Sequence, residues 1–281
     1  MNNLEVFYDT QNLIRGNGSL HRAISHTYVI EEGFQSGKKP HVENCRVRFE
    51  ENLTLAAALR YVDGGKKTAV LNFANPVEPG GGVWRGSNAQ EEYLCRASNL
   101  YNCLSSRNAA SFYAFHNAIL EKNQFRSIFL ASDRIVYSPR VTVFKVDQPG
   151  PEGMRQVYTN QWMEVDVITC AAPFFNRTDY MLANGDLYYL FCRRIQNILE
   201  AAIDNGAETL ILGAFGCGAF HNPPAVVAGA FADMLLRERY RKAFTDVVFA
   251  VKRSGSSSDN NDVFRNTFSV FPPAGGHGFH L

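Results

Sequence analysis

The sequence lacks the long apolar runs that mark membrane proteins. No stretch approaches the roughly 20 consecutive apolar residues that a membrane span needs. Residues 1–6 also show no charged region followed by an apolar one, which is the pattern of a secretory leader. The sequence therefore predicts no membrane contact, and we expect the protein in the cytoplasm.

Cysteine and histidine are too scattered for a metal site or a disulfide framework. The cysteines form no Cys-x-x-Cys pair, and the seven histidines form no spaced ligand set with them. We expect reduced cysteines, no metal and no cofactor. The six cysteines are Cys45, Cys95, Cys103, Cys170, Cys192 and Cys217.

An excess of charge of one sign is missing as well. The 28 Lys and Arg residues against 27 Asp and Glu residues leave a formal charge of +1, with no long basic run, so direct nucleic-acid binding is not indicated. An anionic small molecule held by backbone amides and helix ends needs no basic patch. A hydrophobic content of 46% over 281 residues predicts a globular protein with a sizeable core, and we expect a monomer.

The most informative stretch is residues 72–92, where a predicted strand leads through three consecutive glycines into a helix. Gly80, Gly81 and Gly82 have no β-carbon, so the backbone there can take positive φ and bring N–H groups close to a ligand. A phosphate or a sugar edge fits such a loop. Glycine triplets also occur in plain surface turns, so the triplet alone leaves both interpretations open.

Two adjacent carboxylates begin the helix that follows the glycines. Apolar residues at helical spacing over 93–104 place Glu91 and Glu92 in the first turn, after an N-cap at Ser87 or Asn88. Acidic residues in a first turn often do no more than complement the helix dipole. Adjacent helical positions diverge by about 100°, so both side chains cannot lie on the buried face. One or both must therefore face the glycine loop.

A second glycine segment repeats the order of strand, turn and helix. A buried-type strand over 209–215 is followed by Gly216 and Gly218, and two prolines then lead into an apolar helix. This order presents amides and a helix N-terminus to a diphosphate. There is no Gly-Lys-Ser or Gly-Lys-Thr and no full Gly-x-Gly-x-x-Gly, which argues against a P-loop or a dinucleotide dehydrogenase. An ordinary βα turn remains the alternative, and the presence of two such loops favours a nucleotide clamp.

Predicted strands alternate with predicted helices along the chain. This order predicts an α/β fold with a central mixed β-sheet flanked by helices. We expect a helical N-terminal extension over residues 1–62, a main domain over 63–271 on which it packs, and a flexible tail over 272–281. The strands are expected at 67–74, 127–131, 141–145, 164–169, 208–214 and 246–251, the helices at 53–62, 90–104, 108–121, 185–204 and 224–239, and polar loops at 147–160 and 254–261.

A strand ending in Asn, three glycines, a short spacer and Gln-Glu-Glu together resemble the signature of the poly(ADP-ribose) glycohydrolases of the macrodomain superfamily, in their microbial (bacterial-type) form. Segments 138–144, 165–173 and 213–223 resemble this family in order and spacing, so the resemblance covers nearly the whole chain. It implies a three-layer macrodomain-like fold. It also implies a hydrolase that cleaves O-glycosidic ribose-ribose bonds of poly(ADP-ribose) from chain ends and releases ADP-ribose, without a metal.

The resemblance also implies roles for individual residues. Glu92 would protonate the departing oxygen and then activate water, and Glu91 would hydrogen-bond a hydroxyl of the leaving ribose. Phe220 would pack on a ribose beside the loop that holds the diphosphate. The implied partners are ADP-ribose, its polymer and ADP-ribosylated proteins. The implied substrate-binding residues are Asn75, Gly80, Gly81, Gly82, Val83, Gln90, Gly216, Cys217, Gly218, Ala219, Phe220 and Asn222.

Several alternatives stay open at this point. The same carboxylates suit a hydrolase that removes mono-ADP-ribose from protein or nucleic acid, and a non-catalytic ADP-ribose-binding module is a third possibility. Trp84 and Arg85 are candidates to cap the distal pocket or to contact the next unit of a polymer. Phe174 departs from the family, in which an Asn commonly follows the small-small-Pro segment. A nucleophilic role for Cys217 lacks an evident base.

Overall fold

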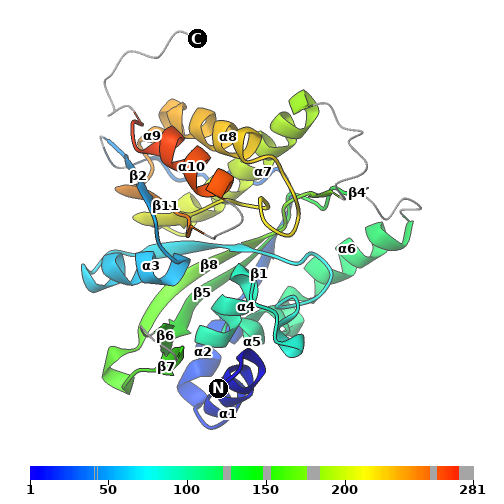
Figure 1. Cartoon of the computed structure of the whole chain (residues 1–281), viewed down its shortest axis with the longest axis vertical. Coiled ribbons are helices and arrows are strands. Elements are labelled where there is room, and N and C mark those ends of the chain that lie inside the picture. Colours follow the sequence, from blue (N-terminus) through cyan, green and yellow to red (C-terminus); the bar gives the residue numbers. More distant parts are fainter. Residues whose placement is uncertain are drawn as a thin grey trace. The chain divides into compact units, whose positions relative to one another are not determined.

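The computed structural model describes residues 1–40, 42, 44–122, 128–147, 153–175, 184–253 and 258–271 (Figure 1). The predicted tail at 272–281 lies outside these residues. The chain forms two compact units, Met1–Glu32 with Val70–Ala172 and Gly33–Ala69 with Pro173–Leu281. The predicted domain boundary at residue 62 stays a prediction, and the compact units divide the chain elsewhere.

The described strands include a seven-stranded mixed sheet. β1 and β8 run antiparallel to β5, whereas β10, β11 and β2 are parallel to one another. β10 and β11 are buried along their whole length, as expected of strands covered on both faces. The predicted α/β class is therefore confirmed. The strand order is β1 (Tyr28–Ile30), β5 (Ile135–Val143), β8 (Met163–Cys170), β3 (Thr68–Phe73), β10 (Thr209–Leu212), β11 (Asp246–Ala250) and β2 (Arg46–Glu50).

In the first unit, helix α1 packs against elements that follow β3 in the chain. Helix α1 begins with a capping box between Asn2 and Glu5, and Gly16 caps its end. It packs on α4 (Figure 1) and on the short helix η2. The elements of this unit besides the sheet strands are α1 (Asn3–Arg15), η1 (Gly18–His21), α2 (Arg22–His26), η2 (Val83–Arg85), α4 (Gln90–Ala97), α5 (Leu100–Leu104), η3 (Arg107–Ala109), α6 (Ala110–Lys122), β4 (Ile128–Phe129), the hairpin of β6 (Lys145–Asp147) and β7 (Met154–Gln156), and η4 (Thr159–Gln161).

In the second unit, α8 packs against both α7 and α10 (Figure 1). Helix α3 packs on β10 and β11, and the helix predicted at 53–62 is thereby confirmed. The remaining elements of this unit are α3 (Thr54–Asp63), β9 (Phe174–Phe175), α7 (Asn184–Asp204), α8 (Pro224–Leu236), α9 (Glu238–Arg241) and α10 (Ser258–Phe268).

The helix predicted at 90–104 is wrong as one element, because it is broken into α4 and α5. Ser98 leaves the helical conformation, bonds the carbonyl of Leu94 through its hydroxyl, and forms a β-bridge with Val143. The side chain of Asn99 accepts a hydrogen bond from the N–H of Thr142. Two short polar residues thus tie the break to β5, a tertiary contact that helical periodicity does not report.

Three other boundaries also differ from the sequence-based expectations. Residues 1–62 are not only helical, because the short strands β1 and β2 form there and pair with β5 and β11. The loop expected at 254–261 is wrong in its second part, where α10 begins at Ser258. The loop expected at 147–160 contains β7 and η4. A strand of three residues is too short to leave a clear alternation in the sequence.

None of the helices in the described part of the chain combines the length and the apolar character that crossing a bilayer requires. All six cysteines are free thiols, and only Cys217 is more than marginally exposed.

Candidate active site

The glycine loop of the first unit leads from the end of β3 to the start of α4. Gly80 and Gly81 take φ values of +70° and +57°, in the left-handed region that disfavours any residue with a β-carbon. A β-carbon on Gly80 would lie 2.8 Å from the ring of Tyr101. The predicted positive φ is therefore confirmed for Gly80 and Gly81 but not for Gly82, whose φ is −86°. Close packing of the loop on its own neighbours is a second reason for glycine at position 80.

Glu92 lies in the first turn of α4 with only 7% of its surface exposed. Its Oε1 accepts a 2.8 Å hydrogen bond from the backbone N–H of Gly82. Its Oε2 is buried and has no hydrogen-bond partner among the described residues. Buried carboxylate oxygens are almost always paired, so an unpaired one in a polar loop indicates an atom that meets a ligand or water.

Glu91 accepts hydrogen bonds on both carboxyl oxygens, whereas Glu92 accepts one on Oε1 only. Oε2 of Glu91 accepts a 2.7 Å hydrogen bond from the N–H of Asn75, and its Oε1 accepts one of 3.2 Å from the amide of Asn72. Burial raises the pKa of Glu91 to about 8, the Asn75 and Asn72 hydrogen bonds oppose that rise, and the charge of Glu92 adds to it. The carboxyl of Glu91 is therefore largely protonated at neutral pH.

Both carboxylates thus face the loop, where the sequence predicted one or both. Both are also buried, so the expectation that one would lie off the buried face is wrong. The N-cap of α4 is Ala89, not Ser87 or Asn88, and it makes no side-chain capping bond. The predicted cap is wrong because Asn88 is engaged elsewhere: its Oδ1 accepts a 2.7 Å hydrogen bond from the guanidinium of Arg96.

Arg96 is a residue of the site that the sequence did not single out. Its guanidinium is buried and also donates a 2.6 Å hydrogen bond to the carbonyl of Ser87, so one side chain fastens two consecutive loop residues. Arg96 stands four positions after Glu92, on the same side of α4. An arginine on the apolar side of a short helix was the available signal, because a buried guanidinium requires several acceptors.

Two predicted substrate-binding side chains serve the loop itself. Asn75 Oδ1 accepts hydrogen bonds of 2.9 Å and 3.0 Å from the N–H groups of Val77 and Glu78, which closes an Asx-type turn. The amide of Gln90 bonds the backbone of β3 twice, to the carbonyl of Leu71 and the N–H of Phe73. A substrate contact for Asn75 and Gln90 stays a prediction.

Asn72 reaches the carboxylates from within the sheet. Its side chain is fully buried, and its amide group donates to Glu91 and, at 3.2 Å, to the hydroxyl of Thr169. Its Oδ1 has no partner in the described part of the chain. The structure therefore gives Asn72 a clear role in orienting Glu91. Val83 is fully buried, so only its backbone is available to a ligand.

The second glycine segment lies in the second unit, between β10 and α8. Gly216 takes φ +74°, and Asn222 fastens the turn by donating to the carbonyls of Gly216 (2.9 Å) and Pro173 (2.7 Å). The Oδ1 of Asn222 is buried and lacks a partner among the described residues. The rings of Phe220 and Phe174 meet edge to face at 5.6 Å. Gly218 and Ala219 are exposed at the tip of the turn.

Cys217 lies in this turn with its thiol largely covered. Burial raises the pKa of the Cys217 thiol well above its usual range, so the thiolate is scarce at neutral pH. This finding argues against a nucleophilic cysteine. Among the residues that the structure describes, no three or more His, Cys, Asp or Glu side chains are grouped so as to hold a metal ion.

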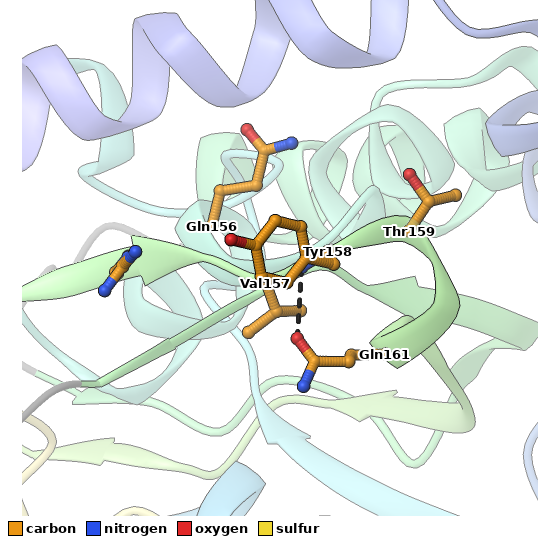
Figure 2. A pocket seen from close by; sticks show the side chains of 6 residues that line it. Gln156, Val157, Tyr158, Thr159 and Gln161 are labelled. Atoms are coloured by element: carbon orange, nitrogen blue, oxygen red, sulfur yellow. Dashed lines mark hydrogen bonds between the residues drawn. The ribbon is translucent and has the colours of Figure 1, made fainter.

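An open pocket of about 460 Å³ lies elsewhere in the first unit, along β7 and η4 (Figure 2). Figure 2 shows the ring of Tyr158 at its centre, with Gln161 accepting a hydrogen bond from the backbone N–H of Tyr158. It contains none of the predicted site residues and no carboxylate. The glycine loop, where an unpaired carboxylate oxygen is present, is therefore the stronger candidate for the active site. The lining residues are Arg155, Gln156, Val157, Tyr158, Thr159 and Gln161.

Comparisons with known proteins agree with the interpretation of the loop. The sequence model described as "Microbial-type PARG, catalytic domain" matches residues 6–146, which is half of the chain. No curated protein matches.

Solved structures of bacterial enzymes are similar over most of the chain. A poly(ADP-ribose) glycohydrolase from Thermomonospora curvata is 30% identical with a TM-score of 0.81, over 95% of this chain and 99% of that one. The same protein bound to the inhibitor ADP-HPD gives a TM-score of 0.80 at the same identity and coverage. A poly(ADP-ribose) glycohydrolase from Deinococcus radiodurans in complex with ADP-ribose is 28% identical with a TM-score of 0.73, over 89% and 97% of the two chains.

Proposed function

Because the chain belongs to the microbial-type poly(ADP-ribose) glycohydrolases, we propose that Glu92 is the acid and base with which it cleaves ribose-ribose bonds. The enzyme is a glycosidase that hydrolyses poly(ADP-ribose) and binds ADP-ribose. The observation that supports Glu92 is its buried Oε2, which has no partner among the described residues. The matched segment, residues 6–146, includes the whole glycine loop and both carboxylates.

The proposed reaction proceeds in two steps at one carboxyl group. Glu92 gives its proton to the glycosidic oxygen, the bond between that oxygen and the anomeric carbon breaks, and the electron pair leaves with the oxygen. The sugar is left as an oxocarbenium-like ion. The carboxylate of Glu92 then takes a proton from water as the water oxygen attacks the anomeric carbon, which restores the acid and releases ADP-ribose.

Gly82 and Glu91 support this chemistry from either side. The N–H of Gly82 fixes Oε1 of Glu92, so the carboxyl group has one orientation and only Oε2 is left to meet the substrate. Burial raises the pKa of Glu91, which lessens the negative charge that Glu91 places beside Glu92. We propose that Glu91 acts chiefly by holding the loop through Asn75.

We assign ligand binding in the second unit to the turn at residues 216–222. The amides of a glycine turn before a helix suit a diphosphate, and Phe220 offers a ring for a ribose. Release of ADP-ribose from chain ends and action on ADP-ribosylated proteins are part of the same proposal.

The test replaces Glu92 by Gln, which keeps the size of the side chain and removes its acid. We expect turnover of labelled poly(ADP-ribose) to fall by about 10²- to 10⁴-fold while calorimetry still detects ADP-ribose binding. A parallel assay on a mono-ADP-ribosylated protein distinguishes the two hydrolase activities. Full turnover by the Glu92→Gln variant would refute the assignment.

A further inference from the structure

Trp84 and Tyr8 form an exposed aromatic pair beside the glycine loop, which we call the Tyr8–Trp84 platform. Trp84 belongs to η2 and Tyr8 to α1, and their ring centroids lie 5.7 Å apart. Their exposed fractions are 41% for Trp84 and 51% for Tyr8. The two rings meet edge to face, with their planes inclined at 69°, and their exposed parts offer an apolar contact to a ligand beside the loop.

Neighbouring aromatic rings hold Trp84 of the platform in place. Trp84 meets Phe7, which is fully buried, edge to face at 4.8 Å, and it meets Tyr101 in the same way at 5.6 Å. Aromatic pairs in this geometry stabilise each other beyond the area they bury. A ring that is already fixed loses little conformational entropy when a flat ligand stacks on it.

Helix α1 is itself anchored on this unit by a buried ammonium group. Lys145 donates to the carbonyl of Val6 (2.9 Å) and the hydroxyl of Thr10 (2.8 Å), and it pairs with Asp9 (2.7 Å). Asn3 adds a 3.1 Å hydrogen bond to the carbonyl of Gly86 in the loop. The positions of Tyr8 and Trp84 are therefore fixed with respect to the loop and its carboxylates.

The platform is also close to the proposed acid. Gly82 bonds Glu92, and Trp84 follows Gly82 by two residues. Consecutive Cα atoms are about 3.8 Å apart, so the Cα of Trp84 lies within about 8 Å of that of Gly82. A polymer whose reacting bond meets Glu92 must cross the surface next to this loop.

The chemical structure of poly(ADP-ribose) indicates which group lies next to this loop. When a ribose-ribose bond breaks, the departing oxygen is a hydroxyl of the ribose that also carries the adenine of the next unit. That adenine is one sugar ring away from the bond. We propose that the Tyr8–Trp84 platform stacks the adenine of the leaving unit and so forms the subsite for the leaving group. This inference rests on the proposed function.

Stacking, and not charge, carries the recognition. The guanidinium of Arg85 next to the platform is paired with both carboxylate oxygens of Glu78, at 2.8 Å and 2.7 Å, which leaves no net charge for a phosphate. Stacking of a base on an aromatic side chain contributes about 1–3 kcal/mol by alanine substitution. Loss of the platform should therefore have an effect that changes little with salt concentration.

The experiment compares two substrates of the full-length enzyme. One is poly(ADP-ribose), and the other is ADP-ribose joined to a small phenol, which has the same reacting sugar but no leaving adenine. We expect Trp84→Ala and Tyr8→Ala to lower kcat/KM for the polymer by about 5- to 100-fold, mainly through KM. Turnover of the phenol substrate and calorimetric binding of ADP-ribose should stay unchanged.

Three further variants complete the test. Trp84→Phe and Tyr8→Phe keep an aromatic ring and should retain most of the polymer activity that the alanine variants lose. Tyr189→Ala removes an exposed ring from the second unit and should leave both activities unchanged.

Each other outcome is decisive. Equal losses on both substrates would mean that the loop is disturbed and would overturn the subsite, as would full polymer activity in both alanine variants. If the unaltered enzyme cleaves the phenol substrate but not the polymer, the proposed function itself fails and the subsite falls with it.

Discussion

Gly81 and Glu92 lie so close together that a β-carbon at position 81 would sit 2.6 Å from Oε1 of Glu92. The same β-carbon would lie 3.1 Å from Oε2 of Glu91. Real β-carbons do not approach other atoms to within 3.0 Å, so any larger residue at position 81 must displace the carboxyl group. The glycine loop is therefore shaped around the carboxylates as well as around a ligand.

The variant Gly81→Ala should abolish most polymer turnover. A displacement of Glu92 by about 1 Å costs on the order of 100-fold in rate, because the proton donor no longer meets the departing oxygen. The measurement is kcat on labelled poly(ADP-ribose). Gly206→Ala is the matched control, since Gly206 has φ +69° but open space where its β-carbon would stand. It should lose about 1–2 kcal/mol of stability and keep its kcat.

The buried carboxyl of Glu91 should make stability depend on pH. The folded chain holds this proton more tightly than the unfolded chain, with a pKa of about 8 against an ordinary 4.5. Its stabilising effect is therefore complete below about pH 4.5 and is lost as the pH rises toward 8. We expect the Tm of Glu91→Gln, relative to that of the unaltered protein, to rise as the pH increases from 5 to 8.

A control for this pH profile is Glu238→Gln. Hydrogen bonding to Lys242 lowers the pKa of the exposed Glu238, so this carboxyl is ionised throughout that range in both states. Its Tm curve should run parallel to that of the unaltered protein. Parallel curves for Glu91→Gln as well would contradict the protonated state of Glu91.

Replacing Arg96 by Lys should loosen the loop between the glycines and α4. A lysine ammonium cannot reproduce the fork that binds Ser87 and Asn88 together, so one acceptor loses a charge-assisted hydrogen bond. Such bonds contribute about 1.5–3 kcal/mol. We expect lower stability together with a kcat reduced about 10- to 100-fold, measured by denaturant unfolding and by polymer turnover.

The variant Arg239→Lys distinguishes a loss of kcat at the loop from a general loss of stability. Arg239 binds Glu200 and the carbonyl of Ser36 in the second unit, so its replacement also costs stability. Its kcat should be unchanged. Equal losses of kcat in the two lysine variants would show that Arg96 has no particular role in positioning the loop.

The variant Asn222→Ala should weaken ADP-ribose binding. Without the two hydrogen bonds to Gly216 and Pro173, the turn loses the link that fixes its backbone amides. We expect the Kd from calorimetry to rise about 10-fold, which corresponds to about 1.4 kcal/mol. Asn205→Ala, which removes a hydrogen bond to Ala201 at the end of α7, should leave the Kd unchanged.

Much of the site could be predicted because its order along the chain is local. Glycines at positions that need positive φ, a carboxylate pair in a first turn, and an apolar strand before them are properties of short segments. The same locality explains the confirmed positions of β3, α3 and α8. The break at Ser98 and Asn99 was missed because its cause is a contact with β5, more than 40 residues away.

The sequence by itself predicted the fold class and the position of the two carboxylates, because periodicity and spacing indicate which residues are buried and where the chain turns, and the resemblance of its motifs indicated the family. Only the tertiary structure decided how the two carboxylates differ. Glu91 receives hydrogen bonds on both oxygens, whereas Glu92 keeps one oxygen unpaired among the described residues. Burial and hydrogen bonding depend on atoms that come together from distant parts of the chain, so neighbours with identical side chains acquire different chemistry.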